Sequence, residues 1–253
     1  MEGLNRLDWV KKIYPDFKEA KWMNDNVIRP EKIENYDFYE ESNTYEDYID
    51  PSKIIGISYA YAYNCFNNIT WLQLLNSLKR LNWVIKNFKT YNEVTKHIYY
   101  NEEDKCVSKY GEYYITTSGQ HRLCLAKFLN LEKVKVSITE YKINESRFNY
   151  YKLLQENIEF LKSVGFYYKT DRELVEYTKN AKYLHLNFGG FKLGISSSIV
   201  PFFIEFYKNL KPNFLYTQYA KLKRNFTSNQ PIYIDTIEEL KKYKHIIITA
   251  KLQ

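Results

Sequence analysis

The residues best suited to chemistry stand together in a short polar stretch, SGQHR, at positions 118–122. The stretch follows an alternating segment, CVSKYGEYYITTS (106–118), and precedes an almost wholly apolar run, LCLAKFLNL (123–131). This order predicts a strand, a glycine turn and a buried helix whose first turn carries an imidazole and a guanidinium. The candidate site residues are Ser118, Gly119, Gln120, His121 and Arg122.

A first turn of this kind is suited to hold an anion. The N-terminus of a helix presents backbone N–H groups and the positive end of the helix dipole, and phosphate binds there readily. Gly119 permits close approach of a ligand, and Arg122 can grip a phosphate with two N–H groups. His121 can donate to an oxyanion or carry a proton. We therefore predict that Ser118, His121 and Arg122 are catalytic and that Gly119, Gln120 and Arg122 bind the cofactor.

A plainer interpretation gives the same residues structural roles. Ser118 would then be an N-cap, and His121 and Arg122 would be surface residues at the start of a helix. Cations are unfavourable at the positive end of a helix dipole, however. Two of them at this turn favour the anion-binding interpretation.

Two further stretches allow a functional and a plain interpretation. NFGGFKLGISSS (187–198) is either a second anion site or a hairpin followed by an N-cap at Ser197 or Ser198, and we favour the hairpin. YAKLKRNFTSNQ (219–230) mixes cations with aromatic rings, which suits nucleic acid, or it is the solvated end of a helix, which we favour.

Metal ligands and disulfides are not predicted. His97, His185 and His245 are scattered and belong to no metal-binding motif. The three cysteines, Cys65, Cys106 and Cys124, are odd in number and widely spaced, so they form no disulfide framework and indicate a reducing compartment.

Length and composition indicate a folded soluble protein of one large or two modest domains: 253 residues, 45% hydrophobic and 26% charged. The net charge is +7, but residues 31–50 contain eight acids and one base, which leaves +14 for the rest. A basic body of this kind suits a phosphate-bearing partner, or is ordinary surface charge. With neither a signal peptide nor a long apolar run, we expect a cytoplasmic protein without a membrane span.

Hydrophobic periodicity predicts the elements that position the polar stretch. We expect one or two short helices in 4–23, a loop or lid at 31–50, a strand at 51–59, and helices at 70–88 and 92–100. A hairpin at 106–118, a helix at 120–129 ended by Asn130 and a strand at 133–141 complete the surroundings.

In the rest of the chain we predict a further helix and then a second mixed unit. We expect helices at 144–164, capped by Asn144 and stopped by Gly165, and at 171–180, capped by Asp171. A hairpin at 182–196 turning at Gly189-Gly190, helices at 198–210, 213–223 and 236–242, and a buried strand at 245–249 follow. The proposed regions are 1–48 with the acidic segment, a phosphate-binding core at 49–143 and an extension at 144–253.

The segment YYITTSGQHRLCLAKFLNLEKVKVSI resembles the ParB/sulfiredoxin-like superfamily, whose members share a strand, a Gly-x-(His/Arg)-Arg box, an apolar helix and a strand. The strand IDPSKIIGI (49–57) is similar to the family's first strand, and the resemblance covers about residues 49–141. It implies an α+β fold with a mixed sheet and packed helices, followed here by a C-terminal helix/strand extension. It also implies a nucleoside triphosphate or diphosphate with Mg²⁺ as the cofactor and an unknown phosphate acceptor.

Several residues depart from the family patterns. The cysteine of sulfiredoxin would fall at Gln120, so that chemistry is not expected, and Cys124 is expected only to pack. Ser118 stands where kinase-like members often carry aspartate, so it cannot be a base. We expect the missing carboxylate to come from the acidic segment, from Glu41, Glu46, Asp47 or Asp50. No helix-turn-helix DNA reader is evident after residue 142.

Three functions remain as hypotheses. The first, which we favour, is a nucleotide-dependent phosphotransferase or NTP-hydrolysing enzyme, a kinase or NTPase using residues 118–122. The second is a ParB-like module that binds or cleaves nucleic acid. The third is a non-catalytic scaffold that binds its ligand at the same box.

Overall fold

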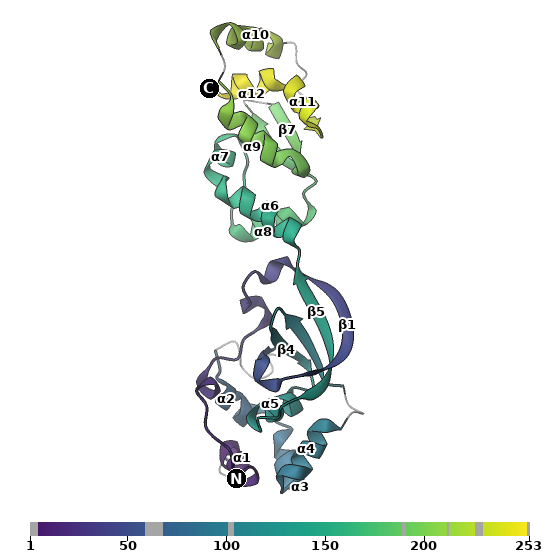
Figure 1. Cartoon of the computed structure of the whole chain (residues 1–253). Coiled ribbons are helices and arrows are strands. Elements are labelled where there is room, and N and C mark those ends of the chain that lie inside the picture. Colours follow the sequence, from purple (N-terminus) through teal and green to yellow (C-terminus); the bar gives the residue numbers. More distant parts are fainter. Residues whose placement is uncertain are drawn as a thin grey trace. The chain divides into compact units, whose positions relative to one another are not determined.

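The computed structural model shows an α+β protein with a five-stranded mixed sheet and a three-stranded mixed sheet. It describes residues 5–58, 68–100, 104–188, 191–211, 213–225 and 230–251. The chain divides into an N-terminal unit, Met1–Asn144, and a C-terminal unit, Glu145–Gln253 (Figure 1). Residues 1–48 therefore belong to the same unit as the segment that carries the SGQHR stretch.

The sheet of the N-terminal unit has the strand order β1-β5-β3-β4-β2. β2 runs parallel to β4 and β3 parallel to β5, whereas β1/β5 and β3/β4 are antiparallel. The predicted hairpin is confirmed, with Gly111 at its turn at φ +58°. The strands are β1 (Tyr39–Ile49), β2 (Ile54–Ile57), β3 (Cys106–Tyr110), β4 (Tyr113–Ser118) and β5 (Val134–Ile143).

The prediction of a loop or lid at 31–50 is wrong. Two short 3-10 turns, Pro30–Lys32 and Tyr36–Phe38, lead into β1, which pairs along β5 at the edge of the sheet. Most β1 side chains are exposed on both faces, so the strand lacks the apolar alternation by which strands are recognised. The strand is held by its backbone hydrogen bonds with β5 and by the 2.6 Å ion pair between Glu46 and Lys135, and not by burial of its side chains.

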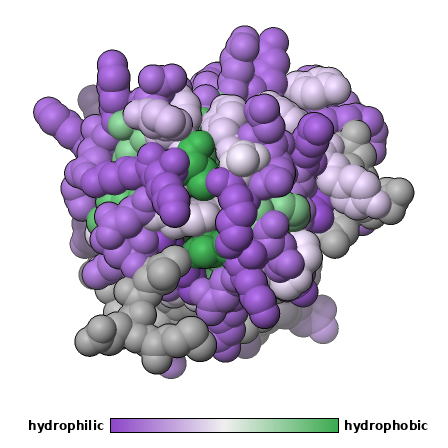
Figure 2. Space-filling model, turned by 90° about the horizontal axis from the view of Figure 1, so that it is seen from below, coloured by the Kyte–Doolittle hydropathy of each residue, from purple (hydrophilic) through white to green (hydrophobic). Residues whose placement is uncertain are grey.

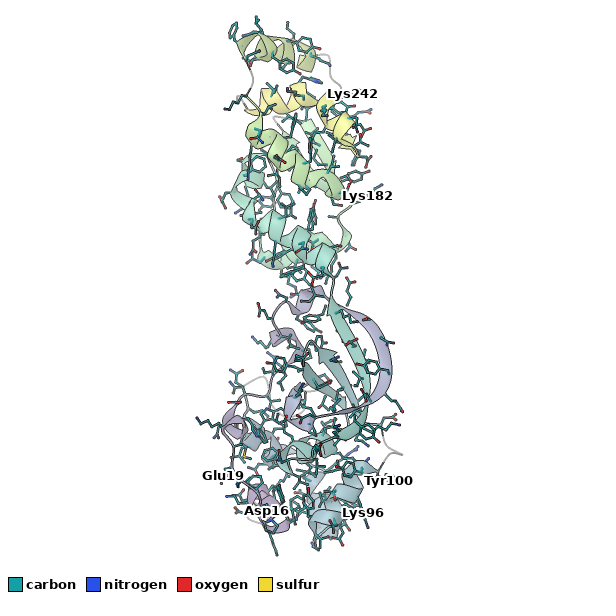
Figure 3. All side chains as sticks on the ribbon, in the orientation of Figure 1. Asp16, Glu19, Lys96, Tyr100, Lys182 and Lys242 are labelled. Atoms are coloured by element: carbon teal, nitrogen blue, oxygen red, sulfur yellow. The ribbon has the colours of Figure 1, made fainter. Side chains whose placement is uncertain are left out.

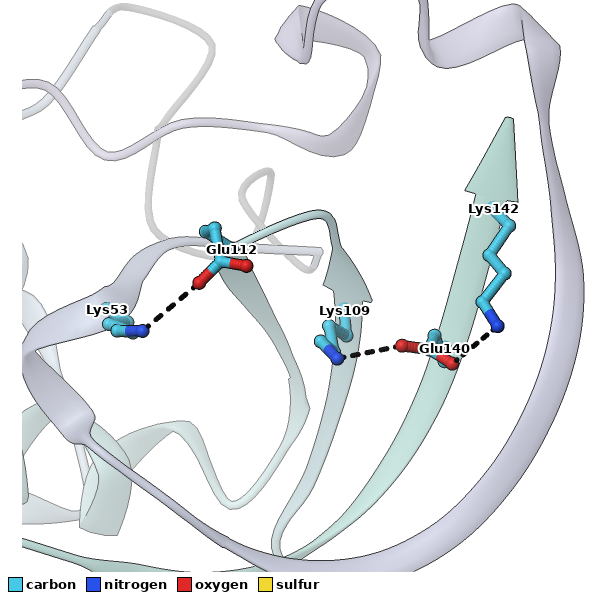
Figure 4. Close-up of polar contacts among 5 residues, drawn as sticks. All are labelled: Lys53, Lys109, Glu112, Glu140 and Lys142. Atoms are coloured by element: carbon cyan, nitrogen blue, oxygen red, sulfur yellow. Dashed lines mark hydrogen bonds and ion pairs between the residues drawn. The ribbon is translucent and has the colours of Figure 1, made fainter. Parts of the chain in front are cut away.

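Ion pairs also lie on this sheet and at the turns beside it (Figure 4). The carboxylate of Glu140 on β5 lies 2.7 Å from the ammonium of Lys109, its register partner on β3, and 3.4 Å from that of Lys142. Lys53 and Glu112 form a more exposed pair at 3.3 Å. Since Lys109 and Glu140 are mostly shielded from water, theirs is the pair expected to contribute most.

The strand predicted at 51–59 is shorter in the structure. Pro51 begins a 3-10 turn, Pro51–Lys53, in which the Asp50 carboxylate accepts a hydrogen bond from the Ser52 N–H at 2.8 Å. Strand β2 then starts at Ile54. Further back, the predicted N-terminal helices are α1 (Arg6–Ile13) and a 3-10 turn at Lys21–Asn24.

The helix predicted at 70–88 is interrupted. It forms α2 (Trp71–Ser77) and α3 (Leu81–Asn87), with Leu78 in an extended conformation between them. The buried Arg6 guanidinium donates to the carbonyl oxygens of Leu75 and Leu78, at 2.7 and 2.8 Å. Because these carbonyls are bound by Arg6, α2 ends there with its terminal oxygens satisfied. Thr70 caps α2 in a capping box, with Gln73 as its partner.

α4 (Tyr91–Tyr99) and α5 (Gln120–Phe128) confirm the other predicted helices of this unit. The end of α5 is a Schellman motif, in which Asn130 adopts φ +50° and the Leu131 N–H donates to Ala126 O. The Lys127 ammonium is buried between the rings of Trp22 and Trp71, 4.8 Å from each ring centroid, and donates to Ser52 O and Ile54 O. These bonds fix α5 against the turn that precedes β2.

A single apolar core joins these helices to the sheet, and α5 lies within it. Leu123, Leu125, Ala126 and Leu129 are wholly buried, as the apolar run predicted. Figure 2 views this unit from the end where α1 and α3 lie; hydrophilic side chains cover most of that face, with small apolar islands between them.

The C-terminal unit has its own core and a sheet of order β6-β7-β8. The hairpin predicted at 182–196 is confirmed, although its Gly189-Gly190 turn lies outside the described residues. The elements are β6 (Tyr183–Phe188), β7 (Phe191–Ser196), β8 (Ile232–Ile234), α8 (Asp171–Asn180), α9 (Val200–Asn209), α10 (Phe214–Asn225) and α11 (Ile237–Lys242).

Several predictions for this unit are wrong in detail. The helix at 144–164 is divided at Asn157 into α6 (Glu145–Glu156) and α7 (Ile158–Ser163), although Gly165 ends it as predicted, at φ +86°. Thr170, not Asp171, caps α8. The segment predicted as the strand 245–249 is helical, within α12 (Lys244–Lys251).

The error at α12 has a physical cause. Ile246, Ile247 and Ile248 are all fully buried, so their helix has no polar face over that turn. Periodicity alone does not distinguish a short strand from a buried helix in a short apolar run. Because β-branched residues such as isoleucine are enriched in strands, the three isoleucines favoured the prediction of a strand. Within the described part of the chain, none of the helices has the length and apolar character needed to cross a bilayer.

Candidate functional site

A cavity of about 680 Å³ opens in the N-terminal unit at the start of α5. The break between α2 and α3, α3 itself, α4, the segment before β3 and the end of β4 supply the rest of its wall. Its lining residues are Arg80, Trp83, Val84, His97, Asp104, Thr117, Ser118, Gly119, Gln120, His121 and Arg122.

All five residues of the SGQHR stretch line this one cavity. Gly119 is the N-cap of α5 at φ +70°, and no side chain caps the helix. The alternative that Ser118 is merely the N-cap is therefore wrong. Because Ser118 ends β4 and does not begin the helix, its hydroxyl belongs to the cavity wall.

Gly119 is required by its backbone and by its neighbours. Its positive φ is a region that other residues adopt only at a cost. A Cβ atom added to it would lie 3.0–3.2 Å from Lys105 Cγ, Lys105 Cα and Asp104 O. The glycine thus allows the chain before β3 to pass directly over the start of α5.

Arg122 is buried, with 5% of its surface exposed. It is positioned by Tyr100, which lies at the C-terminal end of α4 (Figure 3). Its Nη1 donates to Tyr100 O at 3.3 Å, and its guanidinium carbon lies 6.0 Å from the Tyr100 ring centroid. The buried Lys105 ammonium donates to the same carbonyl at 2.9 Å. Two cations therefore converge on a carbonyl at the C-terminal end of α4.

His121 is held in its neutral form. Burial, together with the positive charges of Arg80 and Arg6, lowers its pKa to about 4. At neutral pH the imidazole can accept a proton or donate its single N–H, but it does not add a charge to the cavity. This refines the sequence interpretation, in which His121 was expected to serve either role.

Two functional candidates, Arg80 and Asp104, were missed as members of the site. In the sequence, Arg80 is one of the polar residues of the amphipathic run 70–88, and in the structure the interruption at Leu78 brings it to the cavity. Asp104 is the one acid among the described lining residues. Neither could be found from a local motif, because each joins residues 118–122 through the fold.

The carboxylates predicted from the acidic segment lie elsewhere. Glu46 pairs with Lys135, Asp47 accepts from the Tyr48 N–H at 2.7 Å, and Asp50 caps the turn before β2. Glu41 is exposed on β1. None of the four lines the cavity. Glu41, Glu46 and Asp47 lie on β1, which forms the edge of the sheet farther from β4. The candidate carboxylate of the site is therefore Asp104.

An aromatic cluster forms one side of the cavity. Trp83 packs edge-on against Phe88, with ring centroids 5.4 Å apart, and lies 5.8 Å from the His97 ring. Phe88 and His97 are 5.0 Å apart. Trp83 is nevertheless 56% exposed, so a large aromatic surface remains accessible beside the cationic turn.

The other sequence candidates are placed outside this cavity. Cys124 is buried in the core and its pKa is raised to about 12, which fits the predicted packing role. Ser197 and Ser198 lie in a 3-10 turn before α9, whose N-cap is Ile199, so the predicted serine cap is wrong. His185 and His245 belong to the C-terminal unit. The described residues contain no cluster of His, Cys, Asp and Glu suited to a metal ion.

Comparison with protein-family models, curated proteins and solved structures finds no match to this chain. The cavity itself is therefore the guide to what this chain binds.

Proposed function

We propose that the N-terminal unit binds the phosphate groups of a nucleotide in the cavity at the start of α5 and transfers or hydrolyses its terminal phosphoryl group. The observation that carries this proposal is the shared cavity of Arg80, Arg122 and the N-terminus of α5, with a single acid among its described lining residues. Three sources of positive potential in one hollow favour a multiply charged anion.

The cavity has room and chemistry for more than an inorganic anion. A volume of about 680 Å³ lies within the usual range of small-molecule sites, roughly 300–1,000 Å³. The exposed face of Trp83 offers a planar group a surface on which to stack. A ligand with phosphates at one end and an aromatic base at the other satisfies both parts of the lining.

The residues present also fit a Mg²⁺ ion brought in with the nucleotide. Mg²⁺ in such sites is held by one or two carboxylates together with substrate phosphates, and Asp104 supplies one carboxylate. The ion would neutralise charge on the phosphates. The neutral imidazole of His121 is able to take a proton from an attacking water or acceptor hydroxyl.

We further propose that residues 49–141 belong to the ParB/sulfiredoxin-like superfamily. The proposal is supported by the succession of β4, the glycine turn at Gly119, the buried helix α5 and β5, which is the order implied by the resemblance. The mixed sheet and packed helices are consistent with it.

Arg80 provides the sharpest test of the phosphate site. It is exposed, so Arg80→Ala removes a cation without opening the core. Titration calorimetry with ATP, GTP, CTP and ADP, each with Mg²⁺, should show binding to the wild type and about 10- to 100-fold weaker binding to this variant, the loss typical of a charge-assisted contact. Lys79→Ala is the matched control, because Lys79 is the adjacent exposed cation and does not line the cavity.

The outcomes separate the functions. If none of the nucleotides binds the wild type, or if Lys79→Ala is as damaging as Arg80→Ala, the proposal is wrong. Binding without release of phosphate, measured over hours, would leave a ligand-binding scaffold and overturn the catalytic part.

Trp83→Ala tests the orientation of the nucleotide. Loss of base stacking is expected to weaken nucleotide binding by about 5- to 100-fold, since stacking contributes roughly 1–3 kcal/mol. Binding of inorganic pyrophosphate, which has no base, should change by less than about twofold. Equal losses for both ligands would show that Trp83 supports the cavity and does not stack.

A further inference from the structure

Helix α10 of the C-terminal unit exposes apolar side chains that nothing in the described chain covers. Phe214 is 74% exposed, Leu215 79% and Leu222 63%. The other large hydrophobic side chains exposed in the described residues are tyrosines and Trp83, whose rings carry a polar group. The exposed leucine and phenylalanine side chains of the described chain are thus concentrated on a single helix.

α10 has two distinct faces. Ala220 is fully buried, and Tyr216 and Thr217 are half-buried beside it, on the side where α10 packs against α12 (Figure 1). At about 100° per residue, the exposed Phe214, Leu222, Leu215 and Tyr219 fall on a separate arc of about 140°, which also includes the polar Gln218. The outward arc is therefore additional to the face that holds the helix on its unit.

Lysines border this arc on both sides. On the same helical projection, Lys221 lies about 20° beyond Phe214, and Lys223 lies about 40° beyond Tyr219. Both are exposed. The surrounding sequence contains no acid between Glu205 and Asp235, whereas it contains five cations: Lys208, Lys211, Lys221, Lys223 and Arg224.

We propose that α10 lies on the surface of an anionic phospholipid membrane, with the arc of Phe214, Leu215, Tyr219 and Leu222 in the boundary between headgroups and acyl chains. An apolar arc bordered by lysines is the pattern of an interfacial helix, in which the alkyl stems follow the apolar surface and the ammonium groups reach the lipid phosphates. The anionic headgroups complement the run of cations. This proposal is independent of the nucleotide site.

Two other partners fit the same residues less well. Protein interfaces are depleted of lysine, whereas here lysines border the whole apolar arc. Nucleic acid is gripped by cations and stacked on aromatic rings, and the most exposed side chain of the arc is a leucine, which cannot stack. Lipid accounts for both the leucines and the lysines.

Vesicle flotation with the full chain tests the proposal. The wild type should float with vesicles of phosphatidylcholine containing 30% phosphatidylserine, and about tenfold less with pure phosphatidylcholine or in 0.5 M salt. Leu215→Ser with Leu222→Ser should reduce binding to the anionic vesicles at least about tenfold. Leu215→Met with Leu222→Met, which keeps the apolar surface, should bind as the wild type does. Thermal unfolding of each variant verifies that it is folded.

Each alternative has its own result. If the wild type does not float with anionic vesicles, or if the serine variant floats equally well, the proposal is overturned. A wild-type dimer that the serine substitutions convert to a monomer, measured by light scattering, would make the arc an interface between two copies. Binding to duplex DNA that survives the serine substitutions but is lost in Lys221→Glu with Lys223→Glu would make it a nucleic-acid site.

Discussion

At the scale of a single residue, His121 makes the free energy of unfolding of the N-terminal unit depend on pH. It lines the cavity within reach of the positive charges of Arg80 and Arg6, and it is partly buried, so its charged form is penalised. A phosphate bound beside the neutral His121 imidazole would raise its pKa and favour its protonation. The same histidine makes the folded unit sensitive to acid.

The sign of that sensitivity follows from the two pKa values. In the unfolded chain His121 titrates near 6.5, and in the folded unit near 4. Between these values the unfolded state binds the extra proton, so stability falls as the pH is lowered from about 6.5 to 4, by up to about 3 kcal/mol. We expect His121→Asn to lose this part of the acid dependence.

Tryptophan fluorescence in urea at pH 7, 6, 5 and 4 measures it. All four tryptophans, Trp9, Trp22, Trp71 and Trp83, belong to the N-terminal unit, so the signal reports that unit alone. His185→Asn, an exposed histidine of the C-terminal unit, is the control and should leave the transition unchanged. An identical pH dependence in the wild type and His121→Asn would contradict the prediction.

At the scale of elements, the turn into α5 depends on close contact as well as on conformation. Gly111 and Gly119 both have positive φ, but a Cβ on Gly111 would meet nothing within 4 Å, whereas a Cβ on Gly119 would press on Lys105 and the Asp104 carbonyl. Alanine substitutions at Gly111 and Gly119 therefore separate the destabilisation caused by positive φ from that caused by crowding of the added Cβ.

We expect Gly111→Ala to lower the free energy of unfolding by about 1 kcal/mol and Gly119→Ala by about 2–3 kcal/mol. Urea unfolding followed by tryptophan fluorescence gives both values. Gly119→Ala should also weaken nucleotide binding, because the chain before β3 must shift away from the cavity. Equal costs at the two positions would show that the packing of Asp104 and Lys105 over Gly119 is unimportant.

Elements with a strong local pattern were predictable from the sequence. The hairpin around Gly111, the buried helix α5 and the left-handed Asn130 follow from alternation, an apolar run and a residue that tolerates positive φ. Thr70 likewise marks the start of α2. These features are set by residues close in sequence.

Elements whose state is decided by distant partners were not predictable. The interruption after α2 depends on Arg6, some seventy residues away, binding the carbonyls of Leu75 and Leu78. β1 depends on β5 as a template, and α12 depends on burial among other elements of its unit. The candidate site shows the same division: residues 118–122 form a local motif, whereas Arg80 and Asp104 reach the cavity only through the fold.

At the scale of the whole molecule, each unit contains the components of an independent domain. The apolar clusters are separate: one is formed by residues of Leu7–Ile138 and the other by residues of Leu154–Ile248. Asn144 closes the first unit, since its N–H donates to Phe38 O at 2.8 Å and its side-chain amide to Glu40 at 3.0 Å. The next residue begins α6 of the second unit.

We therefore expect the fragments 1–144 and 145–253 each to fold alone. Fragment 1–144 carries every tryptophan, so its urea transition should match the fluorescence transition of the full chain to within about 1 kcal/mol, because each core is complete without the other. Circular dichroism should show a cooperative transition for 145–253. A fragment that unfolds without cooperativity would mean that its core requires the other unit.

The same fragments divide the two proposed activities. Fragment 1–144 contains the entire described lining of the cavity and should bind nucleotide with the affinity of the full chain. Fragment 145–253 contains α10 and should float with anionic vesicles, while 1–144 should not. Because neither fragment contains the residues of the other site, nucleotide binding by 145–253, or vesicle binding by 1–144 alone, would contradict the assignment of each activity to its unit.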